Sequence, residues 1–418
     1  MRPLKMNNKN PHIVPASALG YSISFLLLVG LLTSGVLFLS SANKRIEVNY
    51  VLEEHLIFNN LFSLNYGASQ SEAGTKQIIH PSGDTSIIVV KEWGMLRSIV
   101  ATTFHKNRKL EKSALSAFLV DHHYPALYLP DHRQQLKLCG ETLLQGDVHV
   151  AERGLGRGNL AKKRFTRKKL SEGKVMKSDR YLPALKKSIR EINESDYLKD
   201  AVKIHTITAD SNFSFTNKTS LFSQSEGLTI SNRLEGNIIL HSATAIIVSG
   251  SARLENVILM APSVRFEEGF EGTVQVIARH EIICEDNVRL NYPSSLILHE
   301  LNGMTNSEQS AIRIGKNAHV LGGVLLISKK FNFRKPLLLQ VLKGTIAGLV
   351  YNQGDTELQG KIIGSLYTNK FTLNAGGGIY GDHLLDATIS SEQLPEDFIR
   401  PNWLMDVKNT KPILLSCF

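Results

Sequence analysis

Residues 342–351 read LKGTIAGLVY and residues 358–367 read LQGKIIGSLY, so nearly the same ten residues occur twice at a spacing of sixteen. The repeated pairs are Leu342/Leu358, Gly344/Gly360, Ile346/Ile362, Gly348/Gly364 and Tyr351/Tyr367. Gly377, Ile379 and Gly381 predict a third, weaker copy with one extra residue. Alternating apolar and small residues are typical of short strands, and so short a unit buries its apolar side only by stacking on its copies. The repeat predicts a β-solenoid, which we place at residues 206–390.

The composition is that of a globular protein with a large core. The chain has 418 residues, of which 42% are hydrophobic and 21% charged, so it is not a disordered chain. Cys139, Cys284 and Cys417 lie far apart and form no C-x-x-C spacing, which excludes a disulfide framework or zinc site written in the sequence. The sequence contains no P-loop, nucleophile elbow or dinucleotide fingerprint, so we predict no cofactor.

The N-terminal region predicts a single membrane span. Residues 10–43 contain no Asp, Glu, Lys or Arg, and residues 16–42, after a basic leader at 1–15, are long enough to cross a bilayer. A cleaved signal peptide is the alternative, because Ser40-Ser41-Ala42 resembles a cleavage site and the leader is basic. The apolar stretch is longer than a usual signal sequence, which favours an anchor. The excess of Lys and Arg before the span predicts an inner-membrane protein whose C-terminal domain is periplasmic or on the cell surface.

The residues after the span predict a helix and a small sheet. Val48, Leu52 and Leu56 are spaced by four, which indicates an amphipathic helix at 43–67 that continues out of the membrane. Residues 76–130 contain short β-like stretches, interrupted by a polar segment at 106–112. We expect a small antiparallel sheet that packs on the helix.

A basic leader, a long apolar helix and an amphipathic continuation resemble the N-terminal part of type IV pilins and pseudopilins, especially the minor ones. The resemblance covers roughly the first 65 residues. It implies that the membrane half packs into a filament and that the second half is the spine of a head domain. Two features of the family are absent here: a Gly immediately before the apolar run and a Glu near its start.

Possible metal ligands are densest at Asp121-His122-His123 and Asp131-His132. Neighbouring histidines point in different directions on any regular element, and Pro125 and Pro130 interrupt this stretch. We interpret it as a solvated loop and predict no metal site.

A strongly basic segment follows a predicted first solenoid turn at 131–152. Between Arg153 and Arg190 there are fourteen Lys or Arg and two acidic residues, so this stretch carries the excess of a chain whose net charge is +10. So dense a run cannot be buried, which predicts an exposed excursion at 153–205. It is either a solvated loop or a salt-sensitive site for nucleic acid or anionic glycan. The candidate anion-binding residues are Lys162, Lys163, Arg164, Arg167, Lys168 and Lys169.

A row of carboxylates is the candidate for chemistry. Arg-Leu-Glu occurs at 233–235 and 253–255, and Phe270-Glu271 follows sixteen residues after Leu254-Glu255. We therefore expect Glu235, Glu255 and Glu271 to stack on the outside of the coil, about 4.8 Å apart. Such a row can bind calcium or hold a proton, although Arg233 and Arg253 beside it favour a structural ion-pair network.

Both ends of a solenoid need a cover, because open strand edges invite polymerisation. The proline-rich tail at 391–418 is predicted to cover one end, and the basic segment or the small sheet the other. The C-terminal two-thirds of the chain resembles the bactofilin-like, polymer-forming solenoids. This resemblance implies a right-handed β-solenoid (a parallel β-helix) in a mainly β protein that works by assembly, without catalysis.

Three functions remain open at this point. The first is a non-enzymatic, single-pass envelope protein of a pilus-like, surface or secretion assembly, whose partners are other envelope proteins or further copies. The second is a surface protein that binds nucleic acid or anionic glycan through the basic segment. The third is a polysaccharide-active enzyme, which the fold alone neither requires nor excludes.

Overall fold

The computed structural model describes residues 16–70, 72–120, 124–207, 210–300, 309–329, 335–375, 377–399, 401, 403–405 and 410–418. The chain divides into two units, residues 1–59 and 60–418. The predicted basic leader at 1–15 lies outside the described residues.

One continuous helix, α1 (Ala16–Ser69), contains both helices that the sequence predicts. Pro15 immediately precedes it in the sequence, a position that suits proline, and the next proline is Pro81. The apolar side chains of the membrane-span candidate are exposed, among them Leu37 at 70% and Phe38 at 72%. Its last turns belong to the second unit, where Leu64 and Ala68 are buried. The helix therefore carries an uncovered apolar half and ends inside a folded core.

The small antiparallel sheet expected after the helix is present, and its strand order is β1-β2-β3-β4-β31. Its strands are β1 (Gly74–Ile79), β2 (Thr85–Trp93), β3 (Leu96–His105), β4 (Arg108–Val120) and β31 (Thr410–Cys417). Leu64 and Ala68 pack on one face of this sheet, against Ile88, Ile99 and Ala114 among others. The polar segment at 106–112 is not a break, because the chain turns at Lys106 with a φ of 49° and β4 starts at Arg108.

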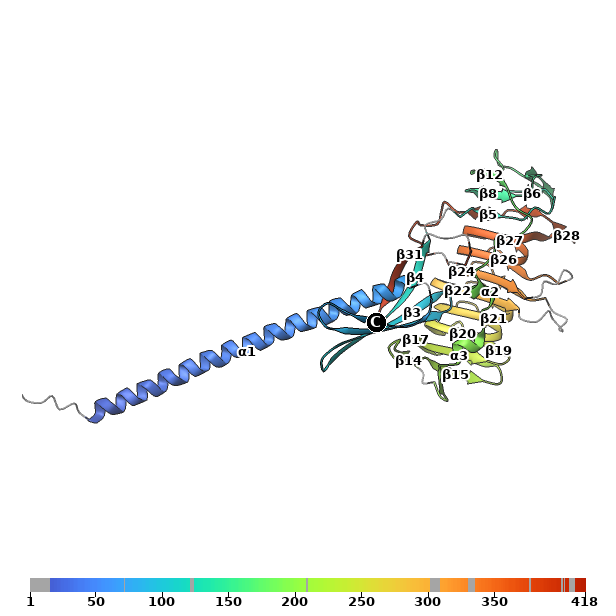
Figure 1. The fold of residues 1–418 in the computed structure, drawn as a ribbon. Coiled ribbons are helices and arrows are strands. Elements are labelled where there is room, and N and C mark those ends of the chain that lie inside the picture. Colours follow the sequence, from blue (N-terminus) through green and yellow to red (C-terminus); the bar gives the residue numbers. More distant parts are fainter. Residues whose placement is uncertain are drawn as a thin grey trace, which may run out of the picture. The chain divides into compact units, whose positions relative to one another are not determined.

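The solenoid is inserted between two neighbouring strands of this sheet. Val120 at the end of β4 and Thr410 at the start of β31 are Cα partners, so the chain leaves and re-enters the sheet at one place (Figure 1). Residues 410–417 of the tail therefore complete the sheet and do not cover a solenoid end, contrary to the prediction for this part of the tail.

The solenoid begins near residue 127 and its strands pair in parallel from coil to coil. The first tract contains β5 (Leu127–Tyr128), β6 (Leu136–Cys139), β7 (Leu143–Gln145), β8 (Val148–Val150), β9 (Leu155–Arg157), β10 (Asn159–Leu160), β11 (Lys163–Arg164) and β12 (Val175–Lys177). A connector with α2 (Lys187–Arg190) and α3 (Glu194–Leu198) follows. The main tract starts with β13 (Val202–Ile204), β14 (Asp210–Phe213), β15 (Ser220–Gln224), β16 (Leu228–Ile230), β17 (Arg233–Gly236), β18 (Ile238–Ser242) and β19 (Ala245–Val248). It continues with β20 (Arg253–Phe266), β21 (Glu271–Cys284), β22 (Arg289–Glu300), β23 (Ala311–Ile314), β24 (His319–Ser328), β25 (Leu338–Val341), β26 (Thr345–Leu358) and β27 (Lys361–Ala375). It ends with β28 (Gly378–Gly381), β29 (His383–Leu385) and β30 (Thr388–Ser390).

The sixteen-residue repeat stacks as predicted. Ile346 pairs with Ile362, Gly348 with Gly364 and Tyr351 with Tyr367, all as Cα partners of β26 and β27. The prediction of a third copy is wrong, because β28 folds back on β27 as an antiparallel hairpin. The coil above Lys361–Ile363 is instead formed by β30.

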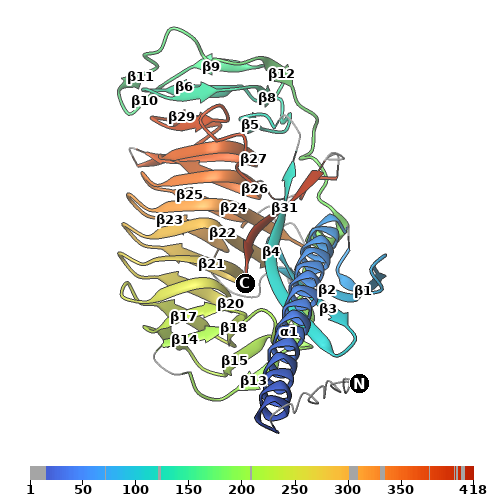
Figure 2. The same cartoon turned by 90° about the vertical axis from the view of Figure 1, so that its left-hand side faces the viewer.

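Coils from two distant parts of the sequence meet at one end. Leu127 of β5 pairs with Leu366 of β27, Val148 of β8 pairs with Leu127, and Val175 of β12 pairs with Val148. The turn predicted at 131–152 therefore lies beyond the last coil of the main tract (Figure 2). Inward-facing side chains of these coils join the core of the main tract.

The connector at 178–201 runs back along the solenoid to its opposite end, where β13 starts the main tract (Figure 2). It packs on an outward-facing column of large side chains, which we call the tyrosine face: Met260, Ile277, Ile297, Leu325, Tyr351, Tyr367 and Tyr128. The second face of the small sheet, with Trp93, Leu96 and Leu115, belongs to the same cluster. The small sheet is therefore buried on both sides, by α1 and by the solenoid.

Candidate functional site

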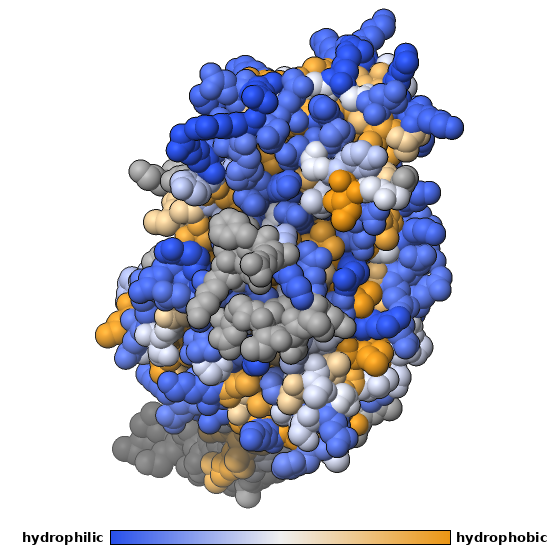
Figure 3. All heavy atoms as spheres, turned by 90° about the vertical axis from the view of Figure 1, so that its right-hand side faces the viewer, coloured by the Kyte–Doolittle hydropathy of each residue, from blue (hydrophilic) through white to orange (hydrophobic). Residues whose placement is uncertain are grey.

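The basic segment forms part of the solenoid end, and its charged side chains are exposed. Its backbone supplies β9, which pairs with β6, and β12, which pairs with β8, so it is not wholly an excursion from the coil. All six candidate anion-binding side chains are exposed: Lys162, Lys163, Arg164, Arg167, Lys168 and Lys169. Hydrophilic residues cover most of this end, at the top of Figure 3.

Few contacts of this segment neutralise its charge. Lys163 Nζ lies 2.6 Å from a carboxylate oxygen of Asp386. Arg157 lies over the ring of Phe165 at 5.6 Å and donates to the carbonyl oxygen of Lys168. Arg167, Lys168 and Lys169 line a hollow of about 510 Å³. The segment thus presents cations on an ordered strand framework.

The predicted row of three carboxylates does not form. Glu235 and Glu255 are Cα partners, but Glu271 pairs with Arg253, and Thr273 takes the position expected for Glu271. The cause is the length of this coil, because Arg253 and Glu271 are partners eighteen residues apart, whereas the prediction assumed sixteen. Arg253 does not neutralise the row either, because its guanidinium donates to the carbonyl oxygens of Gly250 and Ala252. The pair that remains has no convergent third acid.

Of the possible metal ligands predicted from the sequence, only Asp131 and His132 lie in the described part of the chain. Residues 121–123 lie outside the described part of the chain. His132 lies 3.0 Å from the carbonyl oxygen of Asn369 through its Nε2. Asp131 accepts a hydrogen bond from the amide of Arg133, which lowers the pKa of this carboxyl below its ordinary value. These two side chains are thus engaged with the protein itself, at the edge of a cavity that the sequence did not indicate.

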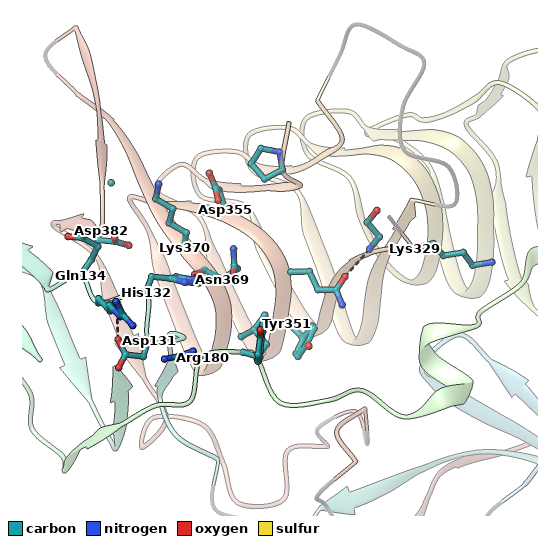
Figure 4. A pocket seen from close by; sticks show the side chains of 17 residues that line it. Asp131, His132, Gln134, Arg180, Lys329, Tyr351, Asp355, Asn369, Lys370 and Asp382 are labelled. Carbon is teal, nitrogen blue, oxygen red and sulfur yellow. Dashed lines mark hydrogen bonds between the residues drawn. The ribbon is translucent and has the colours of Figure 1, made fainter. Parts of the chain in front are cut away.

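This cavity is a polar groove of about 1250 Å³ on the flank of the solenoid (Figure 4). It lies where β26 and β27 leave the tyrosine face, beside the loop after β5 and the start of the connector. We call it the flank groove, and its charged lining residues are Asp131, His132, Arg133, Arg180, Lys329, Asp355, Lys370 and Asp382. Four Lys or Arg and three Asp therefore share the lining, so neither sign of charge dominates it.

The floor of the flank groove holds two carboxylates around one lysine. Asp355 and Lys370 are Cα partners on adjacent coils, and Lys370 lies between Asp355 and Asp382 in Figure 4. Burial raises the pKa of Asp355, and the nearby charge of Asp382 raises it further. Burial likewise raises the pKa of Asp382, whereas Lys370 lowers it. Within the described residues Lys370 forms no ion pair at contact distance with either acid.

The backbone places Asp382 where few residues fit. It has a φ of 53°, a left-handed conformation in which Asp and Asn are enriched, and its side chain is only 9% exposed. Its amide donates to the carbonyl oxygen of Phe371 at 2.9 Å, which joins the hairpin to β27. The Asp382 carboxylate is thus held at the groove by the turn that follows 377–381, the segment wrongly predicted to be a solenoid repeat.

One local sequence signal could have indicated this groove. After the repeated tyrosines the two copies lose their alignment, because a register shift between Asn352 and Asp355 pairs Asp355 with Lys370. Breaks of a solenoid repeat mark positions where side chains are re-aimed. Nothing local in the sequence indicates that Asp131 and Arg180 lie beside them.

The helix α1 is long and apolar enough to cross a membrane. Its most apolar 18-residue window has a mean hydropathy of 2.3 and is not buried by the rest of the structure. Length and composition alone would also fit a signal sequence at the N-terminus. The chain therefore carries a membrane anchor or a signal sequence.

No family model and no curated protein matches the chain. Among solved structures, the chain is similar to the competence-associated pilin ComZ from Thermus thermophilus. The identity is 10%, and the likeness covers 83% of this chain and 86% of that chain with a TM-score of 0.24. At this TM-score the likeness defines neither the fold nor the function of this chain.

Proposed function

We propose that this protein is a membrane-anchored, non-enzymatic envelope protein that presents its solenoid outside the cytoplasm as a subunit of a pilus-like, surface or secretion assembly. One observation carries the proposal. A single helix has an exposed apolar half, and its last turns are the core of an antiparallel sheet from which the solenoid is projected. In the pilin resemblance, the apolar half of such a helix packs into a filament and the second half is the spine of the head.

The structure of the helix favours an anchor over a cleaved signal. Ser40-Ser41-Ala42 lies in the middle of α1, and the hydroxyl of Ser41 donates to the carbonyl oxygen of Phe38 at 2.8 Å. Cleavage at this site would remove the apolar half of α1. The head, which keeps Leu64 and Ala68 in its core, would then have no membrane attachment. Retention of the span keeps the head at the bilayer, where assembly with other envelope proteins or further copies can occur. The right-handed winding and the bactofilin-like polymer state expected from the sequence belong to this proposal.

The test is protease accessibility of the solenoid in intact cells, in cells with a permeabilised outer barrier and in lysed spheroplasts. N-terminal sequencing of the mature chain accompanies it. We expect digestion once the outer barrier is open, and a mature chain that retains residues 16–42. Protection until the inner membrane is broken would place the solenoid in the cytoplasm and overturn the proposal. A mature chain that begins at Asn43 would overturn the anchor.

Binding of an anionic polymer at the basic end is a second candidate, because exposed cations lie there on an ordered framework. Lys162→Gln with Lys168→Gln and Lys169→Gln should weaken binding of heparin and of duplex DNA and should flatten the salt dependence of the affinity. Lys218→Gln with Lys316→Gln and Lys361→Gln, exposed lysines of the main tract, is the control. Affinity that is independent of salt, or equal in both variants, would remove this candidate. The carboxylates Glu235, Glu255 and Glu271, on which the enzyme alternative was based, do not form the predicted row.

A further inference from the structure

We propose that the flank groove is a binding site for an uncharged oligosaccharide, with Asp355 and Asp382 as hydrogen-bond acceptors for its hydroxyl groups. The site does not depend on the membrane anchor or on the basic end, because its lining residues come from the solenoid flank, the loop after β5 and the start of the connector.

Unused acceptor capacity is the first argument. The described residues give the carboxylate of Asp355 no hydrogen-bond donor, and that of Asp382 one donor, the amide of Phe371. An ionised carboxylate offers about four acceptor positions. Asp382 is 9% exposed and Asp355 is half-buried, and both carboxylates line the groove. A ligand that donates hydrogen bonds can therefore occupy their free acceptor positions.

The charge pattern selects the class of ligand. Lys370, Arg180 and Arg133 would repel a cationic ligand at the same place where Asp355 and Asp382 would repel phosphate or sulfate. A hydroxyl group both donates and accepts, so it satisfies carboxylates and cationic donors alike. Hydrogen bonds to charged partners are also the stronger ones. A ligand with many hydroxyl groups and no net charge therefore fits this mixture of carboxylates and cationic side chains.

The shape and the aromatic residues support a chain of sugars. A volume of about 1250 Å³ holds more than a single small molecule. The amide side chains of Gln134, Gln353 and Asn369 lie among the charged groups. Tyr181 on the wall is 81% exposed, so its ring offers a flat apolar surface to the face of a sugar ring. An apolar peptide or lipid would instead leave the charged side chains of this lining without partners.

The experiment uses the full chain in lipid nanodiscs, since glycoside detergents would compete. It is applied to a printed array of uncharged and anionic oligosaccharides, and the best uncharged one is then titrated by calorimetry. Asp355→Asn and Asp382→Asn remove the charge and keep the shape, and Asn is tolerated at the left-handed position of Asp382. The control is Asp386→Asn, which also has a positive φ, of 51°, and pairs with Lys163 at the basic end.

We expect binding to an uncharged oligosaccharide, weakened about 10-fold by each groove variant and unchanged in the control. The groove variants should also unfold at a higher urea concentration, because they remove a carboxylate that burial disfavours. A purely structural role for these acids would not combine a loss of affinity with a gain of stability. Retention of anionic glycans alone, an empty array, or equal affinity of all variants would overturn the proposal.

Discussion

A single methyl group added at Gly348 should destabilise the solenoid strongly. Gly322, Gly348 and Gly364 are Cα partners in three adjacent coils, with φ angles of 151°, 134° and 132°. A Cβ atom on Gly348 would lie 1.7 Å from the carbonyl oxygen of Gly322, far inside van der Waals contact. A backbone region open only to glycine costs an alanine about 1–3 kcal/mol. Separation of the coils adds about 1–3 kcal/mol, as overpacking does in cores.

The expected loss of unfolding free energy for Gly348→Ala is therefore about 2–6 kcal/mol. Gly377→Ala is the matched control, because Gly377 also has a positive φ, of 83°, but has no atom within 4 Å of an added Cβ. Its cost should be limited to about 1–2 kcal/mol from the backbone alone. The assay is urea unfolding of the full chain in micelles, followed by the fluorescence of Trp93 and Trp403, which are both buried. Equal midpoints for the two variants would refute the idea that close approach of the coils requires glycine.

Three further predictions follow from contacts and burial. The hydroxyl group of Tyr351 donates a hydrogen bond to the carbonyl oxygen of Pro183 at 2.9 Å. Tyr351→Phe should therefore lower the free energy of unfolding by about 1 kcal/mol and speed amide hydrogen exchange at 184–186. Unchanged exchange would contradict this role. Burial lowers the pKa of His299 below its ordinary 6.5, so the unfolded chain binds a proton at this residue more readily than the folded chain does. The contribution of neutral His299 to folding stability is therefore complete above pH 6.5 and is lost as the pH falls. The urea midpoint should drop from pH 7.5 to pH 5.5, and by less in His299→Gln; an equal drop would exclude this histidine. Cys139 and Cys284 are buried, which raises the pKa of both thiols, and Cys417 is exposed. Maleimide should label one cysteine in the native protein and three after unfolding, and a second native label would show that the coil opens.

The repeat predicted the stacking because its spacing reflects the geometry of one coil. Apolar residues and glycines recur where the backbone of β26 meets that of β27, so residues sixteen apart in the sequence are neighbours in space. The antiparallel sheet and the long helix were also predictable from local patterns. These features depend on residues that are neighbours in the sequence or one coil apart.

The errors occurred where the length of a coil departs from sixteen residues. Glu255 pairs with Thr273 and Glu271 with Arg253, because these partners are eighteen residues apart. A spacing of sixteen therefore does not place side chains in one row unless the corners have equal lengths. A one-residue register shift hid the pairing of Asp355 with Lys370, whereas the false third repeat at 377–381 is an antiparallel hairpin.

The flank groove could be predicted only in part. Asp355 and Lys370 follow the repeated tyrosines and lie on adjacent coils, so a sequence reading could have placed them on one flank. Asp131 and Arg180 reach the groove because β5 and β12 stack beyond β27. That stacking joins segments far apart in the chain and leaves no periodic signal.

The order of the coils also matters while the chain is being made. The terminal coil, with Leu127, Leu144 and Val148, leaves the ribosome early, but its partner coil is among the last to appear. Gln145 and Ser390, which share a hydrogen bond, are 245 residues apart. At about 5–20 residues per second, this interval corresponds to roughly 12–50 s of synthesis. During that time the terminal coil lacks the strands β27 and β30 that pair with it in the folded protein.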